Sequence, residues 1–273
     1  MRACGELTTS AGIPVTGTMA FLNAMFKVMG DYGYDCVIPC AEGGNNWRKK
    51  ESEGDYKGTR KSQDVAFYTD QSLLLEEVLP TLGMNVCKQP GFEADDVIAH
   101  VSRHSPAYDE IHILTCDRDL LQLVTNKVKV LLFSSAKKME LVDIDGVIKH
   151  FGVYPTEVKY YKALAGDKSD NVAGLPKVGP KTAVKIIEES RPRGEDEFLS
   201  GADRIAFHPK VKERASDFYA NLRLVTLEND VPECSWFASS VPVATHVEAL
   251  LEGLEFKTML KRKVKIFQTL GCA

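Results

Sequence analysis

The segment that decides the fold is residues 111–119, which read IHILTCDRD. Its first five residues are mostly apolar or β-branched, the composition of a buried strand bounded by polar chain. Two carboxylates, Asp117 and Asp119, follow directly where that strand would end. In a parallel sheet, ligand sites lie beyond the carboxyl ends of the strands, so this segment predicts both a strand and the edge of a site.

Helical and strand patterns alternate on both sides of this segment. In chain order, the predicted helices and strands are residues 18–32, 36–38, 73–82, 85–87, 95–104, 120–124 and 128–133. Strands that alternate with helices predict an α/β domain with a mostly parallel sheet flanked by helices.

After about residue 154 the strand signals fade, and helical stretches joined by Gly/Pro turns follow at residues 157–165, 181–189 and 214–227. We therefore expect three parts. They are an α/β domain at 1–155 with a polar, basic segment at 43–72, a helical domain at 156–235 and a C-terminal extension at 236–273.

The composition is that of an ordinary soluble chain, with 44% apolar and 26% charged residues among 273. No apolar run approaches the roughly 18 residues that span a bilayer, so we expect a cytoplasmic protein and no membrane partner. The seven cysteines form no C-x-x-C pair, which argues against a zinc knuckle. The net charge of −4 argues mildly against nucleic-acid binding, but the basic residues are grouped at residues 49–61 and 177–185.

Three acidic clusters occupy comparable places in this pattern: the start of a helix, the end of a strand and a turn that enters the helical domain. Any one of them has a structural explanation, because acids cap helices and favour the helix dipole. Together they would repel, by about 4 kcal/mol for a pair about 4 Å apart at an effective dielectric of about 20, so a cation has to hold them. Their members are Glu93, Asp95, Asp96, Asp117, Asp119, Asp167 and Asp170.

Carboxylates without His or Cys companions favour Mg²⁺ over zinc, and we expect Mn²⁺ to substitute for it. Two such ions about 4 Å apart suit the in-line hydrolysis of a phosphodiester, because they activate water and stabilise the developing charge.

A Gly-bounded turn at residues 174–179 precedes the helix at 181–189. Small residues there let backbone N–H groups at the helix N-terminus approach a phosphate closely, and Lys177 and Lys181 add charge. Such a contact carries no base-sequence information. A turn that merely packs is the alternative.

With these residues, the chain resembles the 5′ nuclease family, which includes flap endonucleases, the 5′-3′ exonuclease domain of DNA polymerase I and phage 5′ exonucleases. The resemblance covers residues 2–229. It rests on GFEADD at 91–96, TCDRDLLQLV at 115–124, GDKSDNVAGLP at 166–176 and YKGTR at 56–60. It implies a PIN-like α/β domain with a basic helical arch, followed by a helix-hairpin-helix domain.

The resemblance also implies roles for individual residues. Glu93, Asp95 and Asp117 would hold the first metal, with Asp96 as a ligand or a supporting group, and Asp119, Asp167 and Asp170 would hold or orient the second. Lys57 and Arg60 would reach the scissile phosphate, although a solvated charged face is their alternative. The DNA contacts would be Arg2, Tyr56, Lys57, Arg60, Gly174, Lys177, Val178, Gly179, Lys181 and Thr182, with K⁺ bound by the hairpin carbonyls.

The sequence departs from the family in two places. Family members begin with a strand that ends in a metal-contacting Asp, whereas Met1-Arg2-Ala3 aligns after that point; we expect a start placed too late or a natural truncation. The family also has an Asp where this chain reads Cys40-Ala41-Glu42-Gly43, and whether Glu42 is a ligand stays open.

Two main hypotheses follow. The first is a monomeric, structure-selective 5′-3′ exonuclease and flap endonuclease of DNA replication or repair, acting on duplex or branched DNA with 5′ single-stranded ends, in a phage or bacterium. The second is a protein that binds branched DNA but is catalytically impaired. A third, an RNA-directed nuclease with a similar core, is less consistent with a hairpin suited to duplex DNA.

Overall fold

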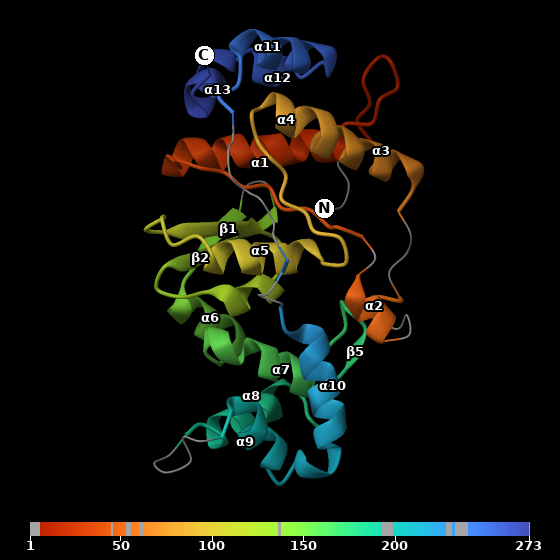
Figure 1. Ribbon diagram of the computed structural model, residues 1–273, viewed down its shortest axis with the longest axis vertical. Helices are drawn as coiled ribbons and strands as arrows, with labels where there is room; N and C mark the ends of the chain where they lie inside the picture. The colour runs from red at the N-terminus through yellow and green to blue at the C-terminus, as the bar shows by residue number, and fades with distance from the viewer. Residues whose placement is uncertain are drawn as a thin grey trace. The chain divides into compact units, whose positions relative to one another are not determined.

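The computed structural model describes residues 6–44, 46–52, 56–59, 63–135, 138–192, 199–227, 231–232 and 240–272. The chain divides into two compact units (Figure 1). Unit 1 comprises Met1–Ala41, Lys61–Lys88 and Glu233–Ala273, and unit 2 comprises Glu42–Arg60 and Gln89–Pro232. Among the described helices, none has the length and apolarity needed to cross a membrane.

Unit 1 is helical in its described part. Helix α1 packs with α3 and with the C-terminal helices around a core that includes Leu22, Phe26 and Phe256. The elements are α1 (Thr16–Tyr32), α3 (Val65–Leu73), η1 (Leu74–Val78), α4 (Leu79–Thr81), α11 (Ala244–Gly253), α12 (Lys257–Leu260) and α13 (Lys263–Leu270). The predicted helix at 18–32 is confirmed by α1, which ends at Gly33 in the left-handed conformation.

Three predictions in unit 1 differ from the structure. The helix expected at 73–82 continues α3 through the π-helical turn η1, which precedes Pro80; a proline has no N–H to donate to the preceding turn, so the regular ladder cannot run through it. The strands expected at 36–38 and 85–87 are not formed. Between these stretches the described chain makes one parallel bridge, Cys40 with Cys87.

The sheet of unit 2 has three described strands in the order β1 (Ile111–Thr115), β2 (Val128–Ser135) and β3 (Lys138–Val142). Strands β1 and β2 are parallel, with Ile113 opposite Val130, which confirms the strands predicted at 111–115 and 128–133. Strand β3 is antiparallel to β2 and was not predicted. Its residues are mostly exposed and carry no apolar run, so the hydrophobic pattern does not mark it.

Helices accompany this sheet, as expected of an α/β fold. They are α2 (Trp47–Glu51), α5 (Ala94–Arg103), η2 (Asp119–Leu123) and α6 (Ile144–Phe151). The predicted helix at 120–124 is thus a short 3₁₀ turn. The helical part of the unit follows with η3 (Pro155–Glu157), α7 (Val158–Ala165), α8 (Pro180–Glu189), α9 (Gly201–Phe207), η5 (Lys212–Arg214) and α10 (Ala215–Val225). Between α7 and α8 lies a small antiparallel hairpin, β4 (Gly166–Asp167) with β5 (Val172–Ala173).

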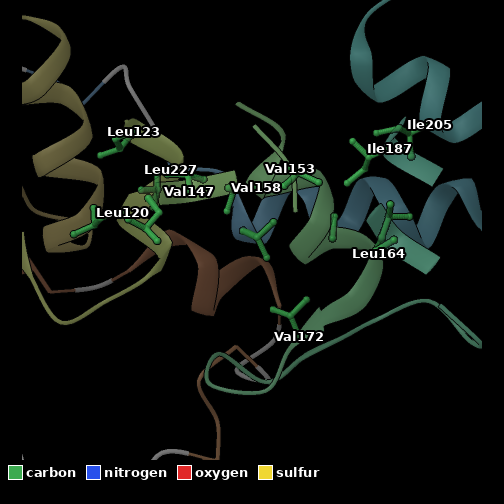
Figure 2. Close-up of a cluster of buried hydrophobic side chains, with 14 of the residues drawn as sticks. Leu120, Leu123, Val147, Val153, Val158, Leu164, Val172, Ile187, Ile205 and Leu227 are labelled. Atoms are coloured by element: carbon green, nitrogen blue, oxygen red, sulfur yellow. The ribbon is translucent and has the colours of Figure 1, made fainter. Parts of the chain in front are cut away.

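One hydrophobic core joins the sheet and the helical part of unit 2 (Figure 2). Leu120 from η2 and Val147 from α6 belong to the same buried cluster as Leu164 from α7 and Ile187 from α8. Because α7 leads directly into β4, this shared core fixes the acidic hairpin relative to the acids at the end of β1.

Candidate metal centre

The first acidic cluster lies at the start of α5. Glu93 is the N-cap residue, and its side chain and that of Asp96 form a capping box, in which the Asp96 carboxylate accepts from the Glu93 N–H at 3.3 Å. Both side chains are buried. Capping therefore accounts for Glu93 and Asp96, whereas the half-buried Asp95 takes no part in the capping box and lies in the first turn of the helix.

The second cluster follows β1. The Asp117 N–H donates to Thr115 Oγ1, and the Asp119 N–H donates to the Asp117 carboxylate, both at 2.9 Å, so a tight turn presents the two acids together. Burial, and next the charge of Asp117, raise the pKa of Asp95 to about 7. The first two clusters therefore face each other closely enough to disfavour full ionisation.

The third cluster sits in the β4–β5 hairpin and meets the second. Carboxylate oxygens of Asp119, Asp167 and Asp170 lie within 4.8 Å of one another, the group of potential metal ligands that the described residues form. The hairpin closes tightly: a Cβ on Gly174 would lie 2.4 Å from the Ala165 carbonyl carbon, so glycine is required there.

The side chain of Lys162, from α7, lies against the acids of the second and third clusters. Its buried ammonium lies 2.6 Å from Asp167 Oδ2 and pairs with Asp119 as well. Although burial opposes it, the ion pair with Lys162 holds the pKa of Asp167 below its usual value. Burial raises the pKa of Asp119 to about 7 despite the same lysine.

Tyr56 connects the first cluster to the third. Its buried hydroxyl lies 3.0 Å from Glu93 Oε2 and 2.9 Å from Asp170 Oδ2. Burial, and then the charges of Glu93 and Asp170, raise the pKa of this phenol. Lys57 completes the link, because its ammonium pairs with Glu93 and its backbone N–H donates to the Asp170 carbonyl at 2.9 Å.

The sequence pattern did not single out two cations of this site, Arg48 and Lys162. Arg48 is buried in α2 against Glu93 and Asp96, with Nη1 at 3.2 and 2.5 Å from their oxygens. In the sequence it stands beside Lys49 and Lys50 and looks like another surface charge. Lys162 left a clearer signal, since it lies in the otherwise apolar stretch before Gly166.

The other expected site residues divide into three groups. Both carboxylate oxygens of Asp96 accept from Arg48. Glu42 is exposed and does not belong to the acidic group that the described chain assembles. Arg2 and Arg60 lie outside the described residues.

The expected phosphate-binding turn precedes α8. Leu175 and Val178 are buried and anchor it, and Lys177 between them has a positive φ of 63°. Helix α8 begins with Gly179 as N-cap and Pro180 in its first turn, with no acidic residue and no side-chain cap there. This helix start offers backbone N–H groups and the exposed Lys181 to an anion, with Thr182 next to it.

The chain matches two family descriptions in succession. Residues 2–152 match the 5'-3' exonuclease, N-terminal resolvase-like domain, and residues 153–242 match the 5'-3' exonuclease, C-terminal SAM fold. A 5'-3' exonuclease of Aquifex aeolicus is 30% identical over 271 residues, which are 97% of this chain and 91% of that protein. The thermostable DNA polymerase I of Thermus aquaticus is 31% identical over 95% of this chain; the chain spans about 31% of the polymerase's length.

Solved structures with this fold include the T5 5'-exonuclease with bound zinc, which is 18% identical over 91% of this chain and 90% of its own, with a TM-score of 0.60. The catalytic core of Rad2 in complex with DNA substrate is 17% identical over 93% of this chain and 82% of its own, with a TM-score of 0.51. These likenesses agree with the α/β domain and the C-terminal helical fold expected from the sequence.

Proposed function

Since the chain belongs to the 5'-3' exonuclease family, we propose that it hydrolyses DNA phosphodiesters as a structure-selective 5′-3′ exonuclease and flap endonuclease in replication or repair. The observation that carries the proposal is the meeting of Asp119, Asp167 and Asp170, whose oxygens lie within 4.8 Å of one another. Lys162 supplies one positive charge to Asp119 and Asp167, which leaves the three carboxylates with an excess of negative charge. A bound cation would balance that excess.

The donor set fits a hard divalent cation, because the three potential ligands that converge are all carboxylates. We assign Glu93, Asp95 and Asp117 to one Mg²⁺ and Asp119, Asp167 and Asp170 to a second. Bound there, the ions would lower the pKa of water and stabilise charge on the phosphate. The T5 5'-exonuclease structure with zinc supports divalent metal use in this fold. We expect Mn²⁺ to replace Mg²⁺.

The protein's own groups then position the phosphate. Lys57 pairs with Glu93, and its ammonium can turn to a phosphate oxygen when another cation neutralises that carboxylate. The Tyr56 hydroxyl contacts the carboxylates of both Glu93 and Asp170 and can donate its single proton to either of them, so it links the first and third acidic clusters. Arg60 is proposed as a second phosphate contact, beyond the described residues.

Duplex DNA would be held by the turn before α8. Gly179 has no atom within 4 Å of an added Cβ, so the approach to the start of the helix is open. Backbone N–H groups and Lys181 would bind phosphates without reading bases, with K⁺ at the turn's carbonyls. A T5 flap endonuclease with this fold has been solved with DNA and metal ions, which supports the same partner for this chain.

The test is cleavage of a 5′-flap DNA with Mg²⁺, compared with EDTA and with an RNA hairpin. We expect cleavage near the flap junction that depends on the metal, leaves a 5′-phosphate and a 3′-hydroxyl, and is faster than cleavage of the RNA. No cleavage under conditions where the Aquifex aeolicus exonuclease cuts the same flap would overturn the proposal.

The contacts of the acids favour a second candidate function, a branched-DNA-binding protein with impaired catalysis. Arg48, Lys57 and Lys162 already pair with carboxylates in all three regions of the site. If these pairs outcompete metal, calorimetry with Mn²⁺ would show no heat of binding while DNA binding persists. The enzyme hypothesis requires heat from Mn²⁺ binding.

A further inference from the structure

Arg48 has every hydrogen-bond donor of its guanidinium in use. A guanidinium has five N–H groups, and five acceptors surround this one. Nε donates to the Leu224 carbonyl at 2.9 Å and Nη2 to the Thr226 carbonyl at 2.7 Å. The other three contacts, at 2.5 to 3.2 Å, go to the carboxylates of Asp96 and Glu93. The residue is only 1% exposed.

These acceptors come from two distant parts of unit 2. Glu93 and Asp96 start α5, beside the acids at the end of β1. Leu224 and Thr226 lie at the end of α10, which packs on α7; Figure 1 labels both α10 and α2. Carbonyls at a helix C-terminus carry partial negative charge, so the guanidinium satisfies this end of α10 and the acidic start of α5 with one charge.

A second arginine in the same place makes an instructive contrast. Arg48 and Arg223 both lie over the ring of Trp47, at 4.5 and 4.8 Å from its centroid. Arg223 is 57% exposed and pairs with Glu51, the last residue of α2; among the described residues it makes no ion pair with the carboxylates of the site. Both arginines thus stabilise α2 through Trp47, but only Arg48 connects the start of α5 to the end of α10.

We propose that Arg48 is a positioning residue that couples the metal-binding start of α5 to the C-terminal end of α10. When Glu93 is fixed by a bound metal, Arg48 is fixed with it, and the last turn of α10 is held through two carbonyls. The pair with Asp96 directs that carboxylate to Arg48, so Asp96 supports the site without being a metal ligand. The inference rests on the proposed function, because it requires metal at Glu93.

The test compares hydrogen exchange at the Thr226 and Leu227 amides with and without saturating Mg²⁺, using Arg48→Lys as the main variant. Lysine keeps the charge but has three donors, so it cannot satisfy five acceptors. In the parent we expect Mg²⁺ to slow exchange by about fivefold or more, the scale of coupled sites. Arg48→Lys should lose this slowing, and Arg223→Lys, the matched control, should keep it.

Asp96→Asn leaves the contact between Arg48 and Glu93 in place, so this variant should keep the slowing, as expected if Asp96 is not a metal ligand. A substitution that only loosens the fold would raise exchange equally with and without metal, whereas loss of coupling removes the difference between the two. Slowing that persists in Arg48→Lys, or no slowing in a parent whose metal binding is proven by calorimetry, would overturn the inference alone. No metal binding by the parent would overturn the proposed function together with it.

Discussion

The ammonium of Lys162 lies 2.6 Å from the carboxylate of Asp167, five residues further along the chain. The side chains of both residues are at most 10% exposed, so water screens their attraction only weakly. The lysine also pairs with Asp119 and thus supplies positive charge in the acidic group where we propose the second metal. Lysine and metal therefore act on the same carboxylates.

Replacing Lys162 with methionine should destabilise the metal-free protein and increase its stabilisation by Mg²⁺. Removing one partner of a buried ion pair costs about 3–5 kcal/mol, because the remaining carboxylates are left unpaired. A bound cation should restore most of this loss. Thermal unfolding in EDTA and in Mg²⁺ measures both effects. Lys168→Met, an exposed lysine in the same hairpin, should change neither, and a Lys162→Met protein that gains no more from Mg²⁺ than the parent would contradict the prediction.

Local patterns made several elements predictable. The strand at 111–115 and the acids after it are encoded within nine residues, and the parallel pairing of β1 with β2 confirms the strand. The strands expected at 36–38 and 85–87 are wrong because their short apolar runs also suit extended chain with a single bridge. The antiparallel β3 has almost no buried residue, so no periodicity announces it.

The sequence pattern marked the acids of the candidate site and Lys57, but it did not mark Arg48 and Lys162. Asp119 and Asp167 stand in sequence patterns, and the structure brings them together with Asp170. The partners of Arg48 include carbonyls 176 and 178 residues away, and such contacts depend on the complete fold. Hydrophobic patterning indicates which helices and strands pack together. It does not indicate which basic side chain becomes buried between carboxylates and the end of a helix.

Asp117→Asn should abolish cleavage while sparing DNA binding. Asparagine keeps the oxygen that accepts from the Asp119 N–H, but it removes the negative charge of Asp117. After burial, that charge is the largest cause of the raised pKa of Asp95. Turnover of a 5′-flap should fall by about 10²–10³-fold or more, the scale for losing a group that stabilises developing charge. Asp109→Asn, an exposed acid just before β1, is the control. Unchanged turnover in Asp117→Asn would remove this residue from the site.

The raised pKa of Asp95, about 7 against a model-compound value of 3.8, predicts how stability depends on pH. Between about pH 4 and 7 the carboxyl is protonated in the metal-free folded protein but ionised in the unfolded chain, so folding takes up a proton. The stability of the folded protein therefore falls as the pH rises through that window. Asp95→Asn should therefore be more stable than the parent at pH 8 in EDTA, by on the order of 2 kcal/mol, and similar to it near pH 5.

Urea unfolding of both proteins at the two pH values measures this difference. With Mg²⁺ added at pH 8 the order should reverse, because the metal neutralises the ionised carboxylate of the parent and has one ligand fewer in the variant. A stability difference that is the same at pH 5 and pH 8 would show that Asp95 is ionised normally in the folded protein.

Lys181→Met should weaken DNA binding and reduce its dependence on salt. Lys181 is exposed in the first turn of α8, where the helix start offers its N–H groups to a phosphate, whereas Lys185 on the same helix lies 3.7 Å from the Glu189 carboxylate. Losing one phosphate contact should lower the slope of log K against log salt by about 0.9. Binding of a duplex in EDTA at several salt concentrations measures the slope, with Lys185→Met as the matched control. Because both substitutions remove one charge from α8, an equal decrease of the slope in the two variants would mean that only the helix's overall charge matters and that the turn before it does not grip DNA.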